Sequence, residues 1–241
     1  MSDGKTGVSA DGRAPRFVRW AWLGRVPYAD VLSLQEQLRD RILGGTAADT
    51  LLLVEHPSVI TLGRNANQDN VLASPQWLEK CGIAMVRVSR GGDVTFHGPG
   101  QLVGYPVFRM RDGIRAHVFS MGRAIIEVLA ELGIAGQWRE SHPGVWLGDE
   151  KICAVGVHVR RGVAIHGFAL NVNVDLSSFG AIVPCGLRAS GVTSIAKQLG
   201  TWPTMEEVAL RTVRAFERCF GVQMARIPAS DSRLQIANGN L

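Results

Sequence analysis

The sequence predicts an α+β fold with a mixed, mainly antiparallel sheet flanked by helices. Short apolar segments with strand character recur along the chain, and turn residues separate them. Other segments repeat apolar residues three and four positions apart, which is typical of amphipathic helices. Strands and helices in this mixture indicate an α+β architecture.

The first half of the chain supplies strands and two helices. The predicted strands are residues 16–23, 51–55, 59–62, 83–88 and 101–108, and the predicted helices are 28–43 and 75–81. In the longer helix, Val31, Leu34, Leu38 and Ile42 recur at helical spacing. A polar loop over residues 63–68 and a glycine-rich segment over 90–100 separate some of these elements.

The second half contains an amphipathic helix, a pair of strands and two further helices. Residues 117–132 carry apolar side chains on one side and end at Gly133, which is typical of a helix C-terminus. Two strands, 151–159 and 163–174, are joined by Arg160-Arg161-Gly162, in the form of a three-residue hairpin loop. This loop would place Lys151 opposite Asn171. Residues 194–199 and 205–220 are predicted helices, and Thr204 is the expected N-cap of the second one.

Length and composition predict one catalytic domain over residues 16–227, between flexible segments at 1–15 and 228–241. The 241 residues are 46% hydrophobic, which is enough to fill a core. No stretch approaches the roughly 20 apolar residues of a membrane span, and no signal peptide precedes the domain. We therefore expect a cytoplasmic protein without a membrane contact. The net charge of +5 suits an anionic macromolecular partner, but the basic residues are dispersed, which disfavours nucleic acid.

The segment from Arg90 to Gln101 is a candidate ligand loop. Its glycines allow the backbone to approach a ligand closely, and Thr95 and His97 add hydroxyl and imidazole donors. An oxyanion or acyl-binding loop is one interpretation, and a tight turn between two strands is the other. The segment is not a dinucleotide fingerprint, because Pro99 removes an amide and a strand follows it.

A second group of candidates combines a lysine, a histidine and a cysteine. Cys185 lies in a Pro-Cys-Gly turn that could present its thiol, although many cysteines are simply buried and inert. Lys151 begins an apolar strand, and it is one of four lysines in a chain that otherwise uses arginine. It could accept a proton from a thiol, or it could only extend from a strand end into water. His166 shares a predicted face with Phe168 and Leu170, and both a structural and a functional role fit it.

Together these residues resemble the octanoyltransferases of lipoate synthesis, from about residue 16 to about residue 220. The motifs that carry the resemblance are Arg90-Gly91-Gly92 with Thr95, His97-Gly98-Pro99-Gly100-Gln101, Tyr105-Pro106, Gly144-Val145-Trp146, Lys151-Ile152, Gly156, His166-Gly167, Ala169-Leu170-Asn171-Val172, Asp175-Leu176, Phe179, Ile182 and Pro184-Cys185-Gly186. The resemblance implies the fold of the biotin and lipoate protein ligase catalytic domain. It also implies a catalytic dyad of Cys185 and Lys151.

The resemblance further implies a substrate site and two protein partners. The expected substrate-binding residues are Arg90, Gly91, Gly92, Thr95, Phe96, His97, Gly98, Gln101, Ala154, Val155, Gly156, His166, Gly167, Phe168, Ala169 and Asn171. The implied acyl donor is octanoyl-acyl carrier protein. The implied acceptors are apo lipoyl domains of 2-oxoacid dehydrogenase E2 subunits and the glycine cleavage H protein. Neither a cofactor nor a metal is expected, and the reaction needs no ATP.

Two other functions remain open at this point. An ATP-dependent lipoate or biotin ligase of the same fold should carry a basic, glycine-rich nucleotide loop, of which residues 63–67 are a poor version. A non-catalytic acyl-binding module would have no use for Lys151 together with Cys185. The chain also departs from the family at Cys153, where small residues are usual. Strand alternation would place this second thiol on the same side as Lys151.

Overall fold

A computed structural model describes residues 16–183 and 191–227 of the chain. Within these ranges, nine strands form one sheet, and three short strands form a second one. The large sheet consists of β1 (Arg16–Arg25), β2 (Thr50–Glu55), β6 (Gln101–Val107), β7 (Gln137–Trp138), β8 (Gly144–Leu147), β9 (Glu150–Arg160), β10 (Val163–Asn171), β11 (Gly191–Val192) and β12 (Val222–Arg226). The small sheet consists of β3 (Val59–Leu62), β4 (Ala84–Arg87) and β5 (Val94–His97). The predicted flexible ends, 1–15 and 228–241, lie outside the described residues.

The large sheet is mixed and mainly antiparallel, as the sequence predicts. Its order is β12-β1-β2-β6-β10-β9-β8-β7, and β11 pairs beside β9. Strand β1 is parallel to both β12 and β2, and β11 is parallel to β9. The pairs from β2 to β7 along this order are antiparallel. Strands β9 and β10 therefore lie inside the sheet, where neighbours cover both of their edges.

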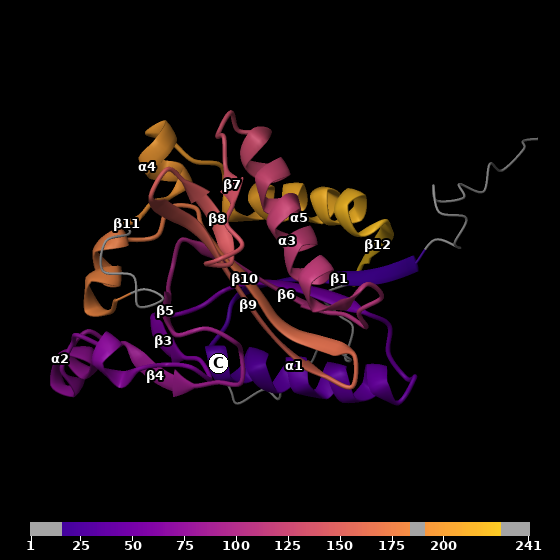
Figure 1. The fold of residues 1–241 in the computed structure, drawn as a ribbon, viewed down its shortest axis with the longest axis horizontal. Coiled ribbons are helices and arrows are strands. Elements are labelled where there is room, and N and C mark those ends of the chain that lie inside the picture. Colours follow the sequence, from indigo (N-terminus) through magenta and orange to yellow (C-terminus); the bar gives the residue numbers. More distant parts are fainter. Residues whose placement is uncertain (1–15, 184–190, 228–241) are drawn as a thin grey trace, which may run out of the picture.

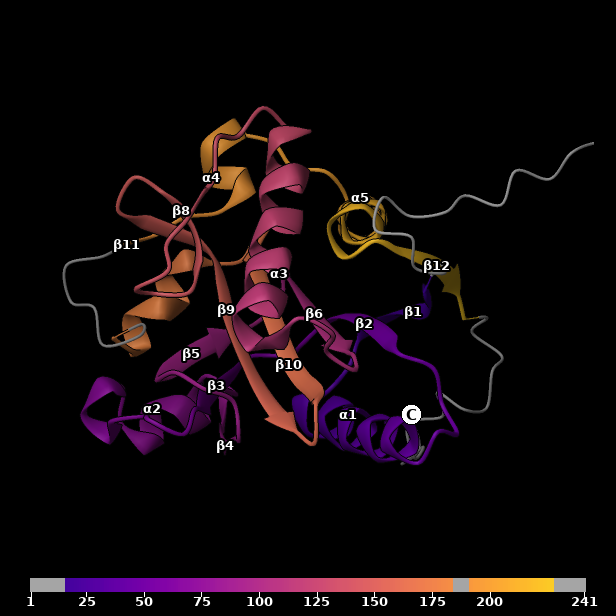
Figure 2. The ribbon, with the colours of Figure 1, turned by 45° about the vertical axis from the view of Figure 1, so that its right-hand side comes forward.

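Helices cover both faces of this sheet (Figure 1). The long helices are α1 (Tyr28–Leu43), α3 (Gly113–Ala130) and α5 (Met205–Phe220), and the shorter ones are α2 (Pro75–Lys80) and α4 (Ile195–Leu199), with 3-10 turns at Gln68–Asn70 and Leu176–Ala181. Figure 2 shows α3 and α5 on one side of the sheet and α1 on the other. One core lies between the sheet and α3 with α5, and a second lies between the sheet and α1. A third apolar cluster, around Phe96 and Phe179, belongs to the small sheet.

The helix boundaries follow local capping chemistry. Thr204 caps α5 in a capping box with Glu207, so the predicted N-cap is confirmed. Helix α3 begins at Gly113, one turn before the predicted start. Ile114 in that first turn is 50% exposed, so the apolar periodicity does not extend into it. Helix α1 has the predicted bounds because its apolar face is buried along its whole length.

The β9–β10 hairpin corrects the predicted register by one residue. Its loop has two residues, Arg161 and Gly162, and both have positive φ, 48° and 81°. Positive φ at both central residues is the geometry of the type I′ turn, which matches the twist of antiparallel strands. Arg160 therefore pairs with Val163, and Leu170 pairs with Cys153. The prediction that Lys151 lies opposite Asn171 was wrong, because it assumed a three-residue loop.

Candidate active site

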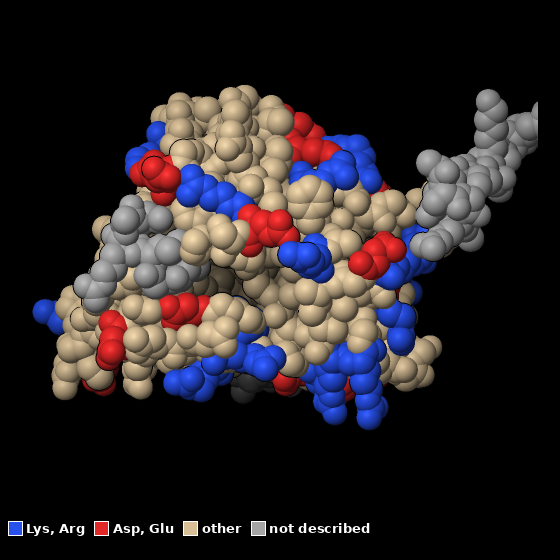
Figure 3. Space-filling view, in the orientation of Figure 1, with Lys and Arg blue, Asp and Glu red and all other residues tan. Residues whose placement is uncertain are grey.

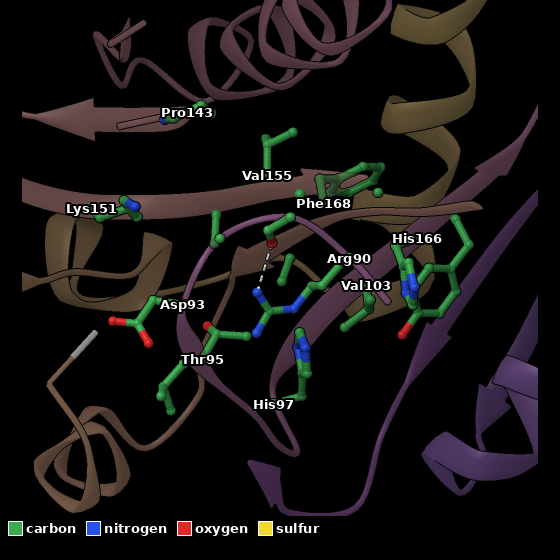
Figure 4. Close-up of a pocket in the computed structure, with 18 of the residues that line it drawn as sticks. Arg90, Asp93, Thr95, His97, Val103, Pro143, Lys151, Val155, His166 and Phe168 are labelled. Atoms are coloured by element: carbon green, nitrogen blue, oxygen red, sulfur yellow. Dashed lines mark hydrogen bonds between the residues drawn. The ribbon is translucent and has the colours of Figure 1, made fainter. Parts of the chain in front are cut away.

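A cavity with about 530 Å³ of space, part of it open to solvent, lies between strands β9 and β10 and the loop that precedes β5. The hollow in the middle of Figure 3 opens on this face of the molecule, and Figure 4 shows its lining. Predicted site residues that line it are Arg90, Gly91, Gly92, Thr95, His97, Lys151, Ala154, Val155, Gly156, His166, Gly167, Phe168 and Ala169.

Arg90 fixes the shape of the glycine loop. Its guanidinium is buried and donates to the carbonyl and the hydroxyl of Thr61, both at 2.8 Å, and to the carbonyl of Gly91 at 3.0 Å (Figure 4). The Gly91 amide donates to the carbonyl of Val157 on β9 at 3.0 Å. A Cβ at Gly63 would lie 2.3 Å from the Gly92 carbonyl oxygen, so the loop passes close against the end of β3. The loop is therefore held from two sides.

His97 projects from β5 into the cavity and is kept neutral (Figure 4). Its Nδ1 donates to Oε1 of Gln101 at 2.7 Å, since Nε2 of Gln101 itself donates to Asn171 at 2.9 Å. Burial, and then the charge of His56, lower the pKa of His97 to about 3. Its Nε2 is consequently an acceptor. The imidazole donor that the sequence predicts at His97 is therefore Nδ1, and it is directed at Gln101.

Gln101 and Asn171 continue this hydrogen-bond chain toward Lys151. Asn171 donates to the carbonyl of Thr193 at 2.9 Å, and the Thr193 amide donates to the carbonyl of Lys151 at 3.1 Å. Gln101 and Asn171 line a smaller adjoining cavity, which shares Thr95 and Lys151 with the main one. Both residues therefore connect His97 on one wall with the backbone of Lys151 on the other.

His166 lies at a distorted point of β10. Its φ of 59° is left-handed, and its amide donates to Oε1 of buried Gln35 at 2.8 Å. Its ring lies 3.5 Å from the Tyr28 hydroxyl and 3.1 Å from the Ser89 hydroxyl. Burial, and then the charge of Arg90, lower the pKa of His166 to about 3.

The predicted side-chain direction of His166 is corrected by this geometry. Phe168 and Leu170 belong to the core beneath α3 and α5, whereas the His166 ring meets Tyr28 of α1. The positive φ interrupts the alternation of side chains that the prediction assumed. A Cβ at the next residue, Gly167, would lie 2.1 Å from the carbonyl oxygen of Gly104, so β10 approaches β6 unusually closely there.

Lys151 lies in the cavity wall and is 7% exposed. Its ammonium nitrogen is 4.7 Å from the centre of the Trp146 ring, which is cation–π distance. The neighbouring strand β11 pairs Val192 with Lys151 and Gly191 with Glu150. The described chain therefore resumes, after residues 184–190, directly beside Lys151. The predicted nucleophile, Cys185, falls in that range and lies outside the described residues.

Cys153 is excluded from the cavity by a β-bulge. Val145 pairs with Cys153 and Trp146 pairs with Lys151, so Ile152 is an extra residue in β9. The extra residue reverses the alternation, and Cys153 points into the core with no exposed surface. Burial raises the pKa of this thiol to about 12. The expectation that Cys153 shares a side with Lys151 was wrong.

Two predicted substrate-binding residues lie outside both cavities. Phe96 is buried in the core of the small sheet, and its ring centre is 5.5 Å from that of Phe179. Gly98 leaves room for the Phe96 ring, since a Cβ there would lie 2.7 Å from the ring. Both residues therefore pack on the side of β5 that faces away from the cavity.

Several lining residues carried no predicted binding role. They are Tyr28, Asp93, Val94, Val103, Tyr105 and Pro143. Tyr28 and Tyr105 are the only tyrosines in the sequence, and both line this cavity. The scarcity of tyrosine is the one feature of the composition that could have drawn attention to them. The Tyr28 ring stacks on His97 with 5.8 Å between centres. Tyr105 and His56 are joined by a hydrogen bond of 2.8 Å.

Within residues 16–183 and 191–227, no group of three or more His, Cys, Asp or Glu side chains is arranged to hold a metal ion. No helix described there has the length and apolar character needed to cross a bilayer.

Comparison with known proteins gives one consistent family. The sequence model described as "Lipoyl protein ligase A/B catalytic domain" matches residues 27–217. An octanoyltransferase from Solibacter usitatus is 52% identical over 205 residues, which cover 84% of this chain and 92% of that protein.

Solved structures agree on the fold. A bi-partite lipoate protein ligase from Thermoplasma acidophilum, studied with its E2 lipoyl domain, has a TM-score of 0.72 at 18% identity and covers 92% of this chain and 90% of its own. A biotin protein ligase from Aquifex aeolicus has a TM-score of 0.51 at 15% identity and covers 85% of this chain and 69% of its own. The predicted fold type is confirmed. The chain belongs to the lipoyl protein ligase A/B catalytic domain family, among the octanoyltransferases, which are acyltransferase enzymes.

Proposed function

We propose that this chain transfers an octanoyl group from octanoyl-acyl carrier protein to the acceptor lysine of apo lipoyl domains, through a thioester on Cys185. The acceptors would be the E2 subunits of 2-oxoacid dehydrogenases and the glycine cleavage H protein. The octanoyltransferase relatives support the acyl group, and the lipoyl ligase family supports the kind of acceptor. Absence of a membrane contact and a cytoplasmic location remain part of the same proposal.

One observation carries the Cys/Lys mechanism: a buried lysine in the wall of the cavity, next to the point where the described chain resumes. Lys151 is 7% exposed, and a buried ammonium has little reason to be there unless it has a chemical or structural role. Val183 and Gly191 bound the range that contains Cys185, and Gly191 pairs beside Glu150. The chain connectivity thus supports a meeting of Cys185 with Lys151.

The first step would load the enzyme. Lys151 acts as the general base and takes the proton of the Cys185 thiol, and the thiolate attacks the carbonyl carbon of the octanoyl thioester. A new carbon–sulfur bond forms, the bond to the carrier's sulfur breaks, and Lys151 returns the proton to the departing thiolate. Because one thioester replaces another, this step is nearly isoenergetic.

The second step would unload the enzyme onto an amine. The ε-amine of the acceptor lysine attacks the octanoyl-Cys185 carbonyl, an amide forms, and the Cys185 thiolate leaves. The amine loses a proton, and the thiolate regains one through Lys151. An amide is more stable than a thioester, so this step proceeds downhill without ATP.

The cavity would hold the acyl chain against apolar walls and support the reacting carbonyl at its rim. Val103, Phe168 and Ala169 provide apolar surface, and about 0.8 kcal/mol is expected for each methylene buried there. The Gly91 amide is already bonded to Val157, so the remaining loop groups near Thr95 are better placed to contact the substrate. Gln101 and Asn171 would hold Lys151 and His97 in place.

A transfer assay distinguishes this function from its rivals. Purified enzyme, octanoyl-acyl carrier protein and an apo lipoyl domain are incubated without ATP, and the mass of the lipoyl domain is measured. Addition of one octanoyl group is expected with wild-type enzyme. Almost none is expected with Cys185→Ala, and Cys81→Ala should act as wild type because that cysteine is exposed and lines neither cavity. Transfer that requires ATP and free octanoate would instead indicate a ligase.

A further inference from the structure

A row of side chains leads from the cavity along β9 to a basic surface. Ala154 and Gly156 line the cavity, and a Cβ at Gly156 would lie 3.3 Å from the carbonyl oxygen of Gly91. Side chains two positions apart share one face of a strand. His158 and Arg160 therefore continue the row, on the same face, out of the cavity.

Further basic residues gather at the end of this row. The Arg64 amide donates to the carbonyl of Arg90 at 3.0 Å, and the Gly91 amide donates to the carbonyl of Val157 at 3.0 Å, so Arg64 lies beside the β9 row. In agreement with this geometry, burial and then the charges of Arg64, Arg39 and Arg160 lower the pKa of His158. Arg39 is buried and already pairs with Asp40 at 3.0 Å. Arg64, Arg160 and Arg161 are exposed, and we call these three the basic patch. Figure 3 shows lysine and arginine side chains along the lower edge of the face that contains the hollow.

Arg161 occupies a position that its side chain does not favour. Its φ is 48°, and the first central residue of a type I′ turn is preferentially Asn, Asp or Gly. A left-handed conformation is unfavourable for a residue with a Cβ, because the Cβ approaches the following carbonyl oxygen. An exposed arginine is kept there in spite of this cost, which is consistent with a use for its charge.

The distance between the cavity and the basic patch suits a carrier arm. Ala154 lines both cavities together with Lys151. His158 and Arg160 are four and six residues beyond Ala154, which corresponds to about 13 and 20 Å along a strand. The phosphopantetheine arm of an acyl carrier has about 13 bonds between its sulfur and its phosphorus, or roughly 16 Å at the advance per bond of an extended peptide. A thioester held beside Ala154 would therefore bring the base of the arm to a point between His158 and Arg160, at the edge of the basic patch.

We propose that the basic patch is the surface on which the acidic acyl carrier protein docks when it delivers the octanoyl thioester. This inference rests on the proposed function and locates the donor on the enzyme. The positive charge of the patch complements the negative charge of the carrier. The row of small residues on β9 leaves room for the arm to reach the cavity. The acceptor lipoyl domain approaches after the carrier has left and does not depend on this surface.

The test neutralises the patch and measures each half-reaction. The triple variant Arg64→Gln, Arg160→Gln, Arg161→Asn removes three charges, and asparagine suits the turn at position 161. At about 0.05 M salt, kcat/KM for octanoyl-acyl carrier protein should fall at least about tenfold, as expected when steering is lost. The values of kcat/KM for octanoyl-pantetheine, which has no carrier, and for the apo lipoyl domain should stay within about twofold of wild type. Arg214→Gln, at an exposed position of α5, is the control and should change none of them.

Three results would overturn the docking surface: an unchanged value for the carrier protein, an equal fall for octanoyl-pantetheine, or a fall confined to the lipoyl domain. The last would assign the patch to the acceptor. Wild-type enzyme separates this inference from the proposed function. If wild-type enzyme transfers nothing from octanoyl-acyl carrier protein, the proposed function is contradicted. If wild-type enzyme transfers normally and the triple variant does so equally well, only the docking surface is contradicted.

Discussion

The fold should lose stability steeply between pH 7 and pH 5, because buried histidines are held in their neutral form. Burial lowers the pKa of His56 and His117 to about 4, and that of His97 and His166 to about 3. In the unfolded chain a histidine has a pKa of about 6.5, so below that pH the unfolded state binds more protons. The stabilisation is present above pH 6.5 and is lost as the pH falls toward 4. Each histidine lowers the free energy of unfolding by roughly 2 kcal/mol at pH 5 relative to pH 7, which amounts to about 8 kcal/mol for these four.

His117 allows this calculation to be tested outside the active site. Its ring contacts those of Phe108 and Phe220, with 6.1 and 5.5 Å between centres. Its Nε2 has no hydrogen-bond partner among residues 16–183 and 191–227. In His117→Phe, the loss of unfolding free energy between pH 7 and pH 5 should be about 2 kcal/mol smaller than in wild type. Urea unfolding at both pH values gives this difference, whatever the packing cost of phenylalanine. An identical loss in the two proteins would refute the assignment of a neutral buried His117.

Three further predictions concern the chemistry, the strand contact and the donor. Lys151→Arg keeps the charge but removes the base, so turnover should fall at least about 10²-fold; near-normal turnover would show that only the charge matters. Gly167→Ala should destabilise the fold by about 3 kcal/mol in thermal or urea unfolding, because its Cβ would lie 2.1 Å from the Gly104 oxygen. Gly180→Ala has open space and should have little effect; equal stability of both variants would contradict the close contact. Raising salt from about 0.05 to 0.5 M should slow reaction with octanoyl-acyl carrier protein several-fold and with octanoyl-CoA less; equal sensitivity would remove the electrostatic argument.

Apolar periodicity was sufficient to predict most elements of the fold. The helix at Tyr28–Leu43 and the strand at Val59–Leu62 have the predicted bounds, because burial of one face or of a whole short strand is visible in sequence. The first turn of α3 was missed because its side chains are exposed, so they add nothing to the apolar pattern. Strands β2 and β3 follow one another yet belong to different sheets, which local pattern alone does not reveal.

The candidate site was predicted where glycine and polar residues cluster, and it was missed where the backbone departs from regular strand geometry. The bulge at Ile152 turns Cys153 away from Lys151, and the positive φ of His166 turns its ring toward Tyr28. Neither distortion follows from side-chain alternation. Tyr28 was missed as a lining residue because it lies on a helix distant in sequence from the other walls.

Identification of the acylated residue tests the central claim, which is covalent transfer through Cys185. The enzyme is incubated with octanoyl-acyl carrier protein in the absence of acceptor, and its intact mass and its peptides are measured. The account predicts a gain of one octanoyl group that hydroxylamine removes and that maps to Cys185. Cys153, whose buried thiol has a pKa raised to about 12, should stay unmodified. An octanoyl group on Cys153, or undiminished transfer to lipoyl domains by an enzyme that never gains the group, would contradict the mechanism.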